Sequence, residues 1–180
     1  LSITSVNDAP VVSGRVNLGS IDEDNELIIN SDQLLSKASD VDNDSLSINN
    51  LKIARGQGDI TDNENGTYTF NPNQDWNGQV RLAYDIEDNN GGEVSIKAKL
   101  SVDPVNDAPI LSGTAAKLDL GKEDQSFTIT SANLLQGFTD ADGDQLSVTN
   151  LEVTNGDGSL DLSQEVNWIF TPQANWNGSV

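Results

Sequence analysis

The 180-residue sequence predicts an all-β protein of tandem antiparallel β-sandwiches with Greek-key connections, the second of them truncated. The first observation is an internal repeat, because residues 23–80 align with residues 123–180 at a constant offset of 100, with about a third of the positions identical. An offset near 100 residues matches a whole sandwich domain, whereas solenoid repeats usually take 20–50 residues. The second observation is period-two alternation of apolar side chains, bounded by turns rich in Gly, Asn and Asp.

The opening segment "LSITSVN" (1–7) aligns with "LSVDPVN" (100–106) in the middle of the chain, and "VNDAP" occurs in both places. Since the internal copy closes one module and leads into the next, we predict the same role for the opening segment. The predicted parts are residues 1–6 as the last strand of a preceding module, 7–105 as a complete module and 106–180 as a second module.

Two long strands and their hairpin are predicted near the end of the first module. Residues 80–86 and 94–102 alternate apolar and polar side chains, which indicates strands with one buried face. The loop "DNNGG" (88–92) between them is typical of a hairpin connection. Shorter strands of the same kind are predicted at "SLSI" (45–48) and "TYTF" (67–70).

Two equivalent stretches, "SDQLL" (31–35) and "SANLL" (131–135), each predict one helical turn with Ser as its N-cap. The second module stops at Val180, which matches Val80 of the first, so the hairpin equivalent to residues 81–105 is missing from it. We expect an open sandwich with an exposed edge. Either its end is poorly ordered, or the start of another copy completes it.

The composition restricts the function. Asp and Glu number 29 against 9 Lys and Arg, which gives a formal charge of −20 and disfavours binding to nucleic acid or anionic membranes. No apolar run is long enough to insert into a membrane. His and Cys are absent, so the commonest catalytic bases and thiol nucleophiles are missing, and we expect no enzyme. The acidity predicts either a solubilising surface or divalent-cation sites.

The acidic residues are clustered. In "DVDND", Asp40, Asp42 and Asp44 occupy alternate positions of a loop, where like charges cost free energy unless a cation lies between them. An EF-hand would need Gly and Glu where Ser45 and Leu51 stand. A Ca²⁺-binding β-turn loop remains, and the alternative is an Asx-rich turn without an ion. The second copy of the triplet is Asp140, Asp142 and Asp144.

The stretch "VRLAYDIEDNNGGEVSIKAKLSVDPVNDAP" (80–109) resembles the closing hairpin and linker of a cadherin repeat, and "ASDVDNDSLSI" (38–48) resembles its A-x-D-x-D segment. The motifs "PVNDAP", "DADGDQLS" and "PQANWNG" resemble still more closely the cadherin-like tandem repeats of giant bacterial surface adhesins, of the VCBS and RTX-adhesin type. This resemblance implies Ig-like, cadherin-like sandwiches outside the cell, on a bacterial surface or secreted, with a role in adhesion and biofilms.

In cadherins, Ca²⁺ binds at the joint between consecutive domains, with ligands from both domains and the linker. The D-R-E motif of that family is absent here, with Asp75 as a loose substitute, and Pro104-Val105 lengthens the linker by one residue, so one or two ions per joint are implied. The resemblance assigns Glu23, Asp103, Asn106, Asp107, Asp140 and Asp142 to the central joint, and Asn7, Asp8, Asp40, Asp42 and Asp88 to the lower half of another; Asp44 and Asp144 complete the triplets as further candidate ligands.

The function that follows is a calcium-rigidified extender of an adhesin stalk, whose partners are neighbouring modules of the same chain. The alternative is a recognition module that binds a glycan or another adhesin copy. Trp76 and Trp176, in matching "WNG" turns, either stack on sugar rings or close the core of each sandwich. A hydrolase is a third alternative, but acidic pairs occur throughout the chain and none can be singled out.

Overall fold

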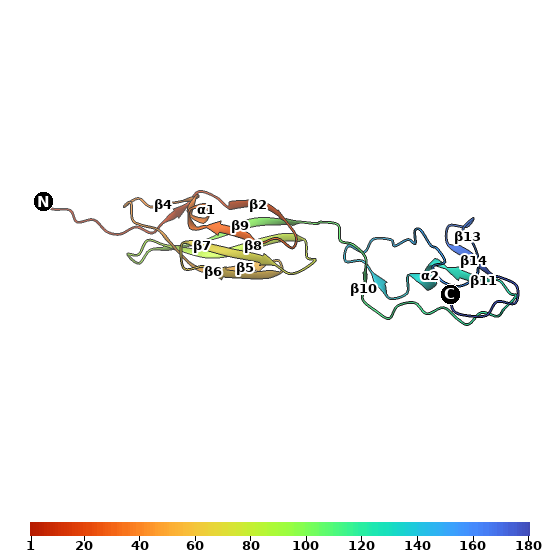
Figure 1. Ribbon diagram of the computed structural model, residues 1–180. Helices are drawn as coiled ribbons and strands as arrows, with labels where there is room; N and C mark the ends of the chain where they lie inside the picture. The colour runs from red at the N-terminus through yellow and green to blue at the C-terminus, as the bar shows by residue number, and fades with distance from the viewer. The chain divides into compact units, whose positions relative to one another are not determined.

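The structure is a computed structural model that describes all 180 residues, and it confirms the all-β fold (Figure 1). The chain divides into two compact units, Leu1–Val105 (unit 1) and Asn106–Val180 (unit 2). None of its helices has the length and apolar character needed to cross a lipid bilayer.

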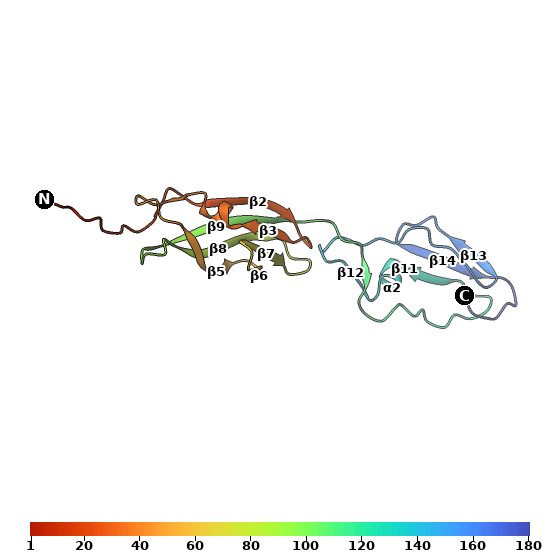
Figure 2. The same ribbon diagram turned by 60° about the vertical axis from the view of Figure 1, so that its left-hand side comes forward.

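Unit 1 is a β-sandwich of two main sheets and one small strand pair (Figure 2). The four-stranded sheet has the order β2 (Val16–Asp22), β9 (Glu93–Asp103), β8 (Gly78–Glu87) and β5 (Ser47–Arg55). The three-stranded sheet has the order β3 (Leu27–Asn30), β7 (Thr67–Pro72) and β6 (Gly58–Asp62), and β1 (Val11–Val12) pairs with β4 (Ala38–Ser39). Residues 1–6 are exposed and form no strand.

The alternating residues of β8 and β9 build the core, as the sequence predicts. Their inward side chains pack against Ile29 of β3 and Phe70 of β7, both fully buried. Tyr84 also buries its ring and donates its hydroxyl proton to the carbonyl oxygen of Leu34 at 2.7 Å, which ties β8 to the helical turn at residues 31–35. The buried residues of β8 and β9 are Val80, Leu82, Tyr84, Ile86, Ile96, Ala98, Leu100 and Val102.

The prediction of a purely antiparallel sandwich is wrong in one place, because β2 pairs with β9 in parallel, with Val16 opposite Ala98 and Ile21 opposite Val102. A parallel pair needs a long connection, and almost the whole of unit 1 lies between these two strands. The strand predicted at 45–48 begins only at Ser47 and extends to Arg55. Ser45 lies outside the ladder, and its carbonyl oxygen accepts a hydrogen bond from the Asn89 side chain instead.

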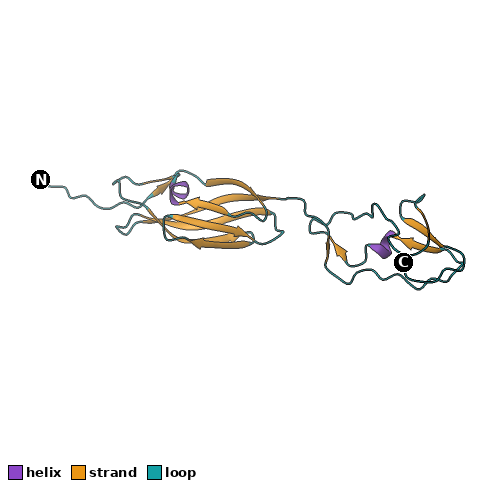
Figure 3. Cartoon of the chain, viewed as in Figure 1, coloured by secondary structure: helices purple, strands orange, loops and turns teal.

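The two predicted helical turns are present as α1 (Ser31–Leu35) and α2 (Ser131–Leu134), drawn purple in Figure 3, but Ser is not the cap. The residue before it takes this position, Asn30 in unit 1 and Thr130 in unit 2. Ser31 is already helical, and its amide and hydroxyl both donate to the carbonyl oxygen of Gly66. These two bonds tie the turn to the loop before β7.

Trp76 packs on the core of unit 1, in line with the structural alternative for the "WNG" turn. A side chain at Gly56 or Gly78 would lie only 3.3 or 3.0 Å from the indole ring. The ring therefore needs glycine on both sides of it. Trp176 has the same neighbours in unit 2, where Gly156 and Gly178 flank the ring.

Unit 2 contains the counterpart of only one of the two main sheets. Its three-stranded sheet has the order β11 (Phe127–Thr130), β14 (Asn167–Pro172) and β13 (Gly158–Asp161), and β10 (Ile110–Leu111) pairs with β12 (Phe138–Thr139). Residues 147–154, which match β5, form no strand. The buried core is correspondingly small and comprises Ile129, Trp168 and Phe170.

Candidate metal centre

The Asp triplet of unit 1 folds into a compact loop before β5. Asp40, Asp42 and Asp44 each place one carboxylate oxygen within 4.8 Å of the others. Asp40 Oδ1 accepts hydrogen bonds from the amides of Asp42 and Asp44, at 2.8 and 3.4 Å. Asp40 Oδ2 is buried and has no hydrogen-bond partner. A buried, unpartnered carboxylate oxygen is costly, and a bound cation would remove that cost.

The segment before β1 connects this loop with the hairpin loop between β8 and β9. The Asp8 amide donates to Asp42 Oδ2 at 2.9 Å, and Asn7 Nδ2 donates to Asp88 Oδ2 at 2.8 Å. Asp88 is buried, and its Oδ1 accepts from the amides of Asn90 and Gly92. Three separate segments thus meet in what we call the N-terminal cluster: Asn7, Asp8, Asp40, Asp42, Asp44 and Asp88.

The hydrogen bond from Asn7 holds the pKa of Asp88 below its ordinary value, assisted by the backbone amides and opposed by burial. A carboxyl group whose pKa is lowered by folding stabilises the fold above its unfolded pKa of about 3.9, and this contribution is lost as the pH falls through the folded pKa. In metal-free protein, Asn7→Ala is therefore expected to raise the pKa of Asp88 and move acid unfolding to higher pH. Carboxyl NMR titration and circular dichroism measure the two effects.

Asn73→Ala is the matched control, because this exposed amide bonds to Gln57 on a different part of unit 1. It should leave both the pKa of Asp88 and the acid-unfolding midpoint unchanged. An unaltered Asp88 pKa in Asn7→Ala would show that this contact does not set the titration.

A second acidic group lies at the other end of β8 and centres on Glu23, which is only 2% exposed. Its Oε1 accepts from the amide of Val105 at 2.7 Å and its Oε2 accepts from Asn77 Nδ2 at 3.4 Å. The Glu23 amide donates to the carbonyl oxygen of Asp103 at 2.9 Å. Two of the predicted ligands therefore meet here, and we call Glu23, Asp24, Asp75, Asn77 and Asp103 the Glu23 cluster.

Sequence reasoning missed Asp24 and Asn77 in this cluster. Asp24 accepts a hydrogen bond from the amide of Asp75 at 3.0 Å, which brings the loop before β8 against the end of β2. The sequence did carry a signal for them, because the Glu-Asp pair at 23–24 and the "WNG" turn at 76–78 both return 100 positions later. The structure repeats the contact as well, since Asp124 accepts from the amide of Asn175 at 2.9 Å.

Unit 2 repeats part of the N-terminal cluster. The Asp107 amide donates to Asp142 Oδ2 at 2.7 Å, the same bond as between Asp8 and Asp42. Asp140 Oδ1 accepts from the amide of Asp144 at 3.1 Å, and Asn106 Nδ2 donates to the carbonyl oxygen of Asp107. The unit 2 cluster therefore comprises Asn106, Asp107, Asp140, Asp142 and Asp144.

The sequence pattern of the cadherin-like domain family matches residues 6–103 and 105–180. No curated protein matches the chain. Several solved structures are similar to it, and three of them are described here. An endo-fucoidan hydrolase from glycoside hydrolase family 107 is 17% identical with a TM-score of 0.41, and the match covers 91% of this chain and 24% of that one. The human desmocollin-1 ectodomain is 11% identical with a TM-score of 0.38, and the match covers 97% of this chain and 33% of that one.

The third is SGBP-B of the Bacteroides ovatus mixed-linkage glucan utilization locus, in complex with a mixed-linkage heptasaccharide. It is 12% identical with a TM-score of 0.35, and the match covers 97% of this chain and 43% of that one. The chain thus spans less than half the length of each of these three proteins.

Proposed function

The chain belongs to the cadherin-like domain family in both units, and from this premise we propose that it is a calcium-rigidified extender of an extracellular adhesin, on a bacterial cell surface. The observation that supports this most directly is the buried Asp40 Oδ2, which lies among other carboxylates and has no hydrogen-bond partner. A chain without His and Cys also offers oxygen as its main ligand atom. We propose no catalytic role.

Calcium is the cation that best suits such a cluster. Ca²⁺ is a hard ion that takes 6–8 oxygen ligands from carboxylates, amide side chains and backbone carbonyls. The N-terminal cluster supplies five carboxylates and one amide side chain, from three segments of unit 1. Extracellular modules bind Ca²⁺ with Kd of about 10⁻⁴–10⁻³ M. Such sites would be filled outside the cell and empty during export.

The Glu23 cluster and the unit 2 cluster are joined by a very short piece of chain. Glu23 binds the amide of Val105, and Asp107 follows only two residues later. Two residues of extended chain span about 7 Å at most. We propose that ions shared by the two clusters hold the units in line, since without them the carboxylates repel each other and the linker is a hinge.

A scattering experiment tests this proposal. Ca²⁺ added to EDTA-treated protein should lengthen the particle, as measured by small-angle X-ray scattering. Asp107→Ala should abolish most of the lengthening while both units stay folded by circular dichroism, because Asp107 belongs to the linker and not to either core. Asp119→Ala removes the same charge from an exposed position of unit 2 and should respond like the unaltered protein.

Identical scattering with and without Ca²⁺ would exclude the stalk function. An unchanged response in Asp107→Ala would remove this residue from the set of ligands.

A further inference from the structure

The few cationic side chains of this acidic protein are concentrated on one surface. The outward face of the four-stranded sheet of unit 1, together with the residue just before β2, holds six of the nine Lys and Arg residues, all of them exposed. We call this surface the basic face: Arg15, Lys52, Arg55, Arg81, Lys97 and Lys99. In a chain with a formal charge of −20, a random distribution would not leave most cations on one sheet.

Strand register shows that the cations are close neighbours. Arg81 lies directly opposite Lys99 on β9 and opposite Arg55 on β5. In the adjacent row, Ala83 lies opposite Lys97 and Lys52, and Arg15 precedes Val16, which pairs with Ala98. Like charges directly opposite each other destabilise a sheet. The basic face is therefore a cost to the fold that an anionic ligand would offset.

The cations of the basic face are not repeated in unit 2. In unit 2, the positions equivalent to Arg15, Lys52 and Arg55 are occupied by Thr114, Glu152 and Asn155. The basic face is thus specific to unit 1.

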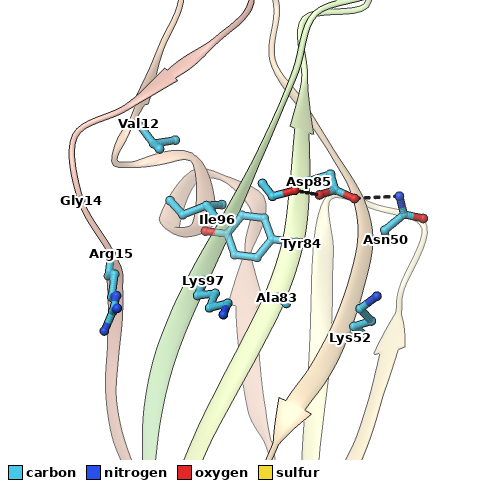
Figure 4. A pocket seen from close by; sticks show the side chains of 11 residues that line it. Val12, Gly14, Arg15, Asn50, Lys52, Ala83, Tyr84, Asp85, Ile96 and Lys97 are labelled. Carbon is cyan, nitrogen blue, oxygen red and sulfur yellow. Dashed lines mark hydrogen bonds between the residues drawn. The ribbon is translucent and has the colours of Figure 1, made fainter.

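The basic face also carries a shallow hollow of about 510 Å³ (Figure 4). Arg15, Lys97 and Lys52 lie around it, and the small residues Gly14 and Ala83 leave it open.

One carboxylate lies within the hollow. Asp85 accepts hydrogen bonds from Ser95 Oγ at 2.6 Å and Asn50 Nδ2 at 2.9 Å, and each of its oxygens retains room for another donor. The only aromatic residue of the lining, Tyr84, is 2% exposed and offers no stacking surface to a neutral sugar.

We propose that the basic face binds an acidic polysaccharide, with its anionic groups over Arg15, Lys52 and Lys97 and a hydroxyl group donating to Asp85. A carboxylate among cations favours a ligand that carries hydroxyl donors as well as negative charges. A DNA backbone or an acidic peptide brings the charges without a regular supply of hydroxyls, so Asp85 would repel it. The overall negative charge of the protein is screened beyond about 8 Å at physiological salt, so the local cations dominate at contact.

The site is independent of the calcium clusters, because none of its residues belongs to them. The whole chain in 2 mM Ca²⁺ would be titrated by calorimetry with chondroitin sulfate, which bears carboxylate, sulfate and hydroxyl groups. Neutral dextran and a DNA oligonucleotide of equal charge serve as comparisons. We expect binding to chondroitin sulfate alone, weakening as salt is raised because cations on the protein replace released counterions.

Two sets of variants localise the site. Arg15→Ser, Lys52→Ser and Lys97→Ser combined should weaken binding at least tenfold, whereas Lys37→Ser, Lys117→Ser and Lys122→Ser combined, with equal charge loss elsewhere, should leave it within twofold. Asp85→Ala should also weaken binding if its carboxylate accepts hydroxyls, and strengthen it if the carboxylate only repels the ligand.

Any of four results would overturn the proposal: no binding to chondroitin sulfate, equal binding to DNA, equal loss in the two triple variants, or tighter binding by Asp85→Ala. Self-association that the basic-face variant abolishes, without polysaccharide binding, would identify a second copy as the partner instead.

Discussion

Calcium at about 10 mM is expected to raise the free energy of unfolding of the metal-free protein by about 1.4–2.7 kcal/mol for each ion that binds only the folded state, given Kd of about 10⁻³–10⁻⁴ M. The physical reason is the N-terminal cluster, where Asp40, Asp42 and Asp44 repel one another and Asp40 Oδ2 is buried without a partner. The midpoint of thermal unfolding should rise by roughly 5–20 °C for a domain of this size. Scanning calorimetry of the EDTA-treated protein, with and without added Ca²⁺, measures this rise in the midpoint.

Asp40→Asn distinguishes ion binding from a general salt effect. The variant removes one of the crowded charges, so its metal-free form should be no less stable than the unaltered protein, yet its stabilisation by Ca²⁺ should be smaller. Asp59→Asn, an exposed position on β6, removes the same charge and should keep the full response. Equal responses in both variants would refute the assignment of Asp40 as a ligand.

Gly92→Ala is expected to disrupt the N-terminal cluster by a different route. A methyl group at this position would collide with Asp88 Oδ2 and would lie 2.6 Å from the Cα atom of Ala9. A backbone atom cannot rotate out of the way as the end of a flexible side chain can. The whole segment that carries Asn7 and Asp8 must therefore shift. Overpacking of this kind costs about 1–3 kcal/mol. Thermal unfolding in EDTA measures this loss, and calorimetric titration should show weaker Ca²⁺ binding.

Gly14→Ala is the matched control, because a methyl group there meets no atom within 4 Å. It should change neither stability nor Ca²⁺ affinity. If Gly92→Ala lowers stability but leaves calcium affinity intact, then residues 7–9 support the fold without taking part in the metal site.

The outline of unit 1 could be predicted from its sequence because its longest strands have one buried face. In β8, Val80, Leu82, Tyr84 and Ile86 alternate with polar or small residues, and each of the four is buried as the period-two pattern requires. The loop between β8 and β9 carries its own turn signal in "DNNGG". The Asp triplet is equally local, since alternate residues of one short loop are close in any fold.

Other features depend on segments that are distant in the sequence. Glu23 is buried but Glu123 is exposed, although both begin the same Glu-Asp pair. The difference arises because Glu23 lies beside the end of β9 and binds Val105 and Asn77, whereas Glu123 has no such strand beside it. The burial of a carboxylate depends on what covers it, and local sequence does not contain that information.

By itself, the sequence determined the module period, the face of each long strand that is buried and the residues that could bind cations. Only the tertiary structure decided that β2 pairs with β9 in parallel, that Asp8 meets Asp42 across 34 residues, and that Arg15 and Lys52 border one hollow. Periodicity is a property of neighbouring residues and is set by backbone geometry, whereas register and convergence depend on which distant strands the packing of the core brings together.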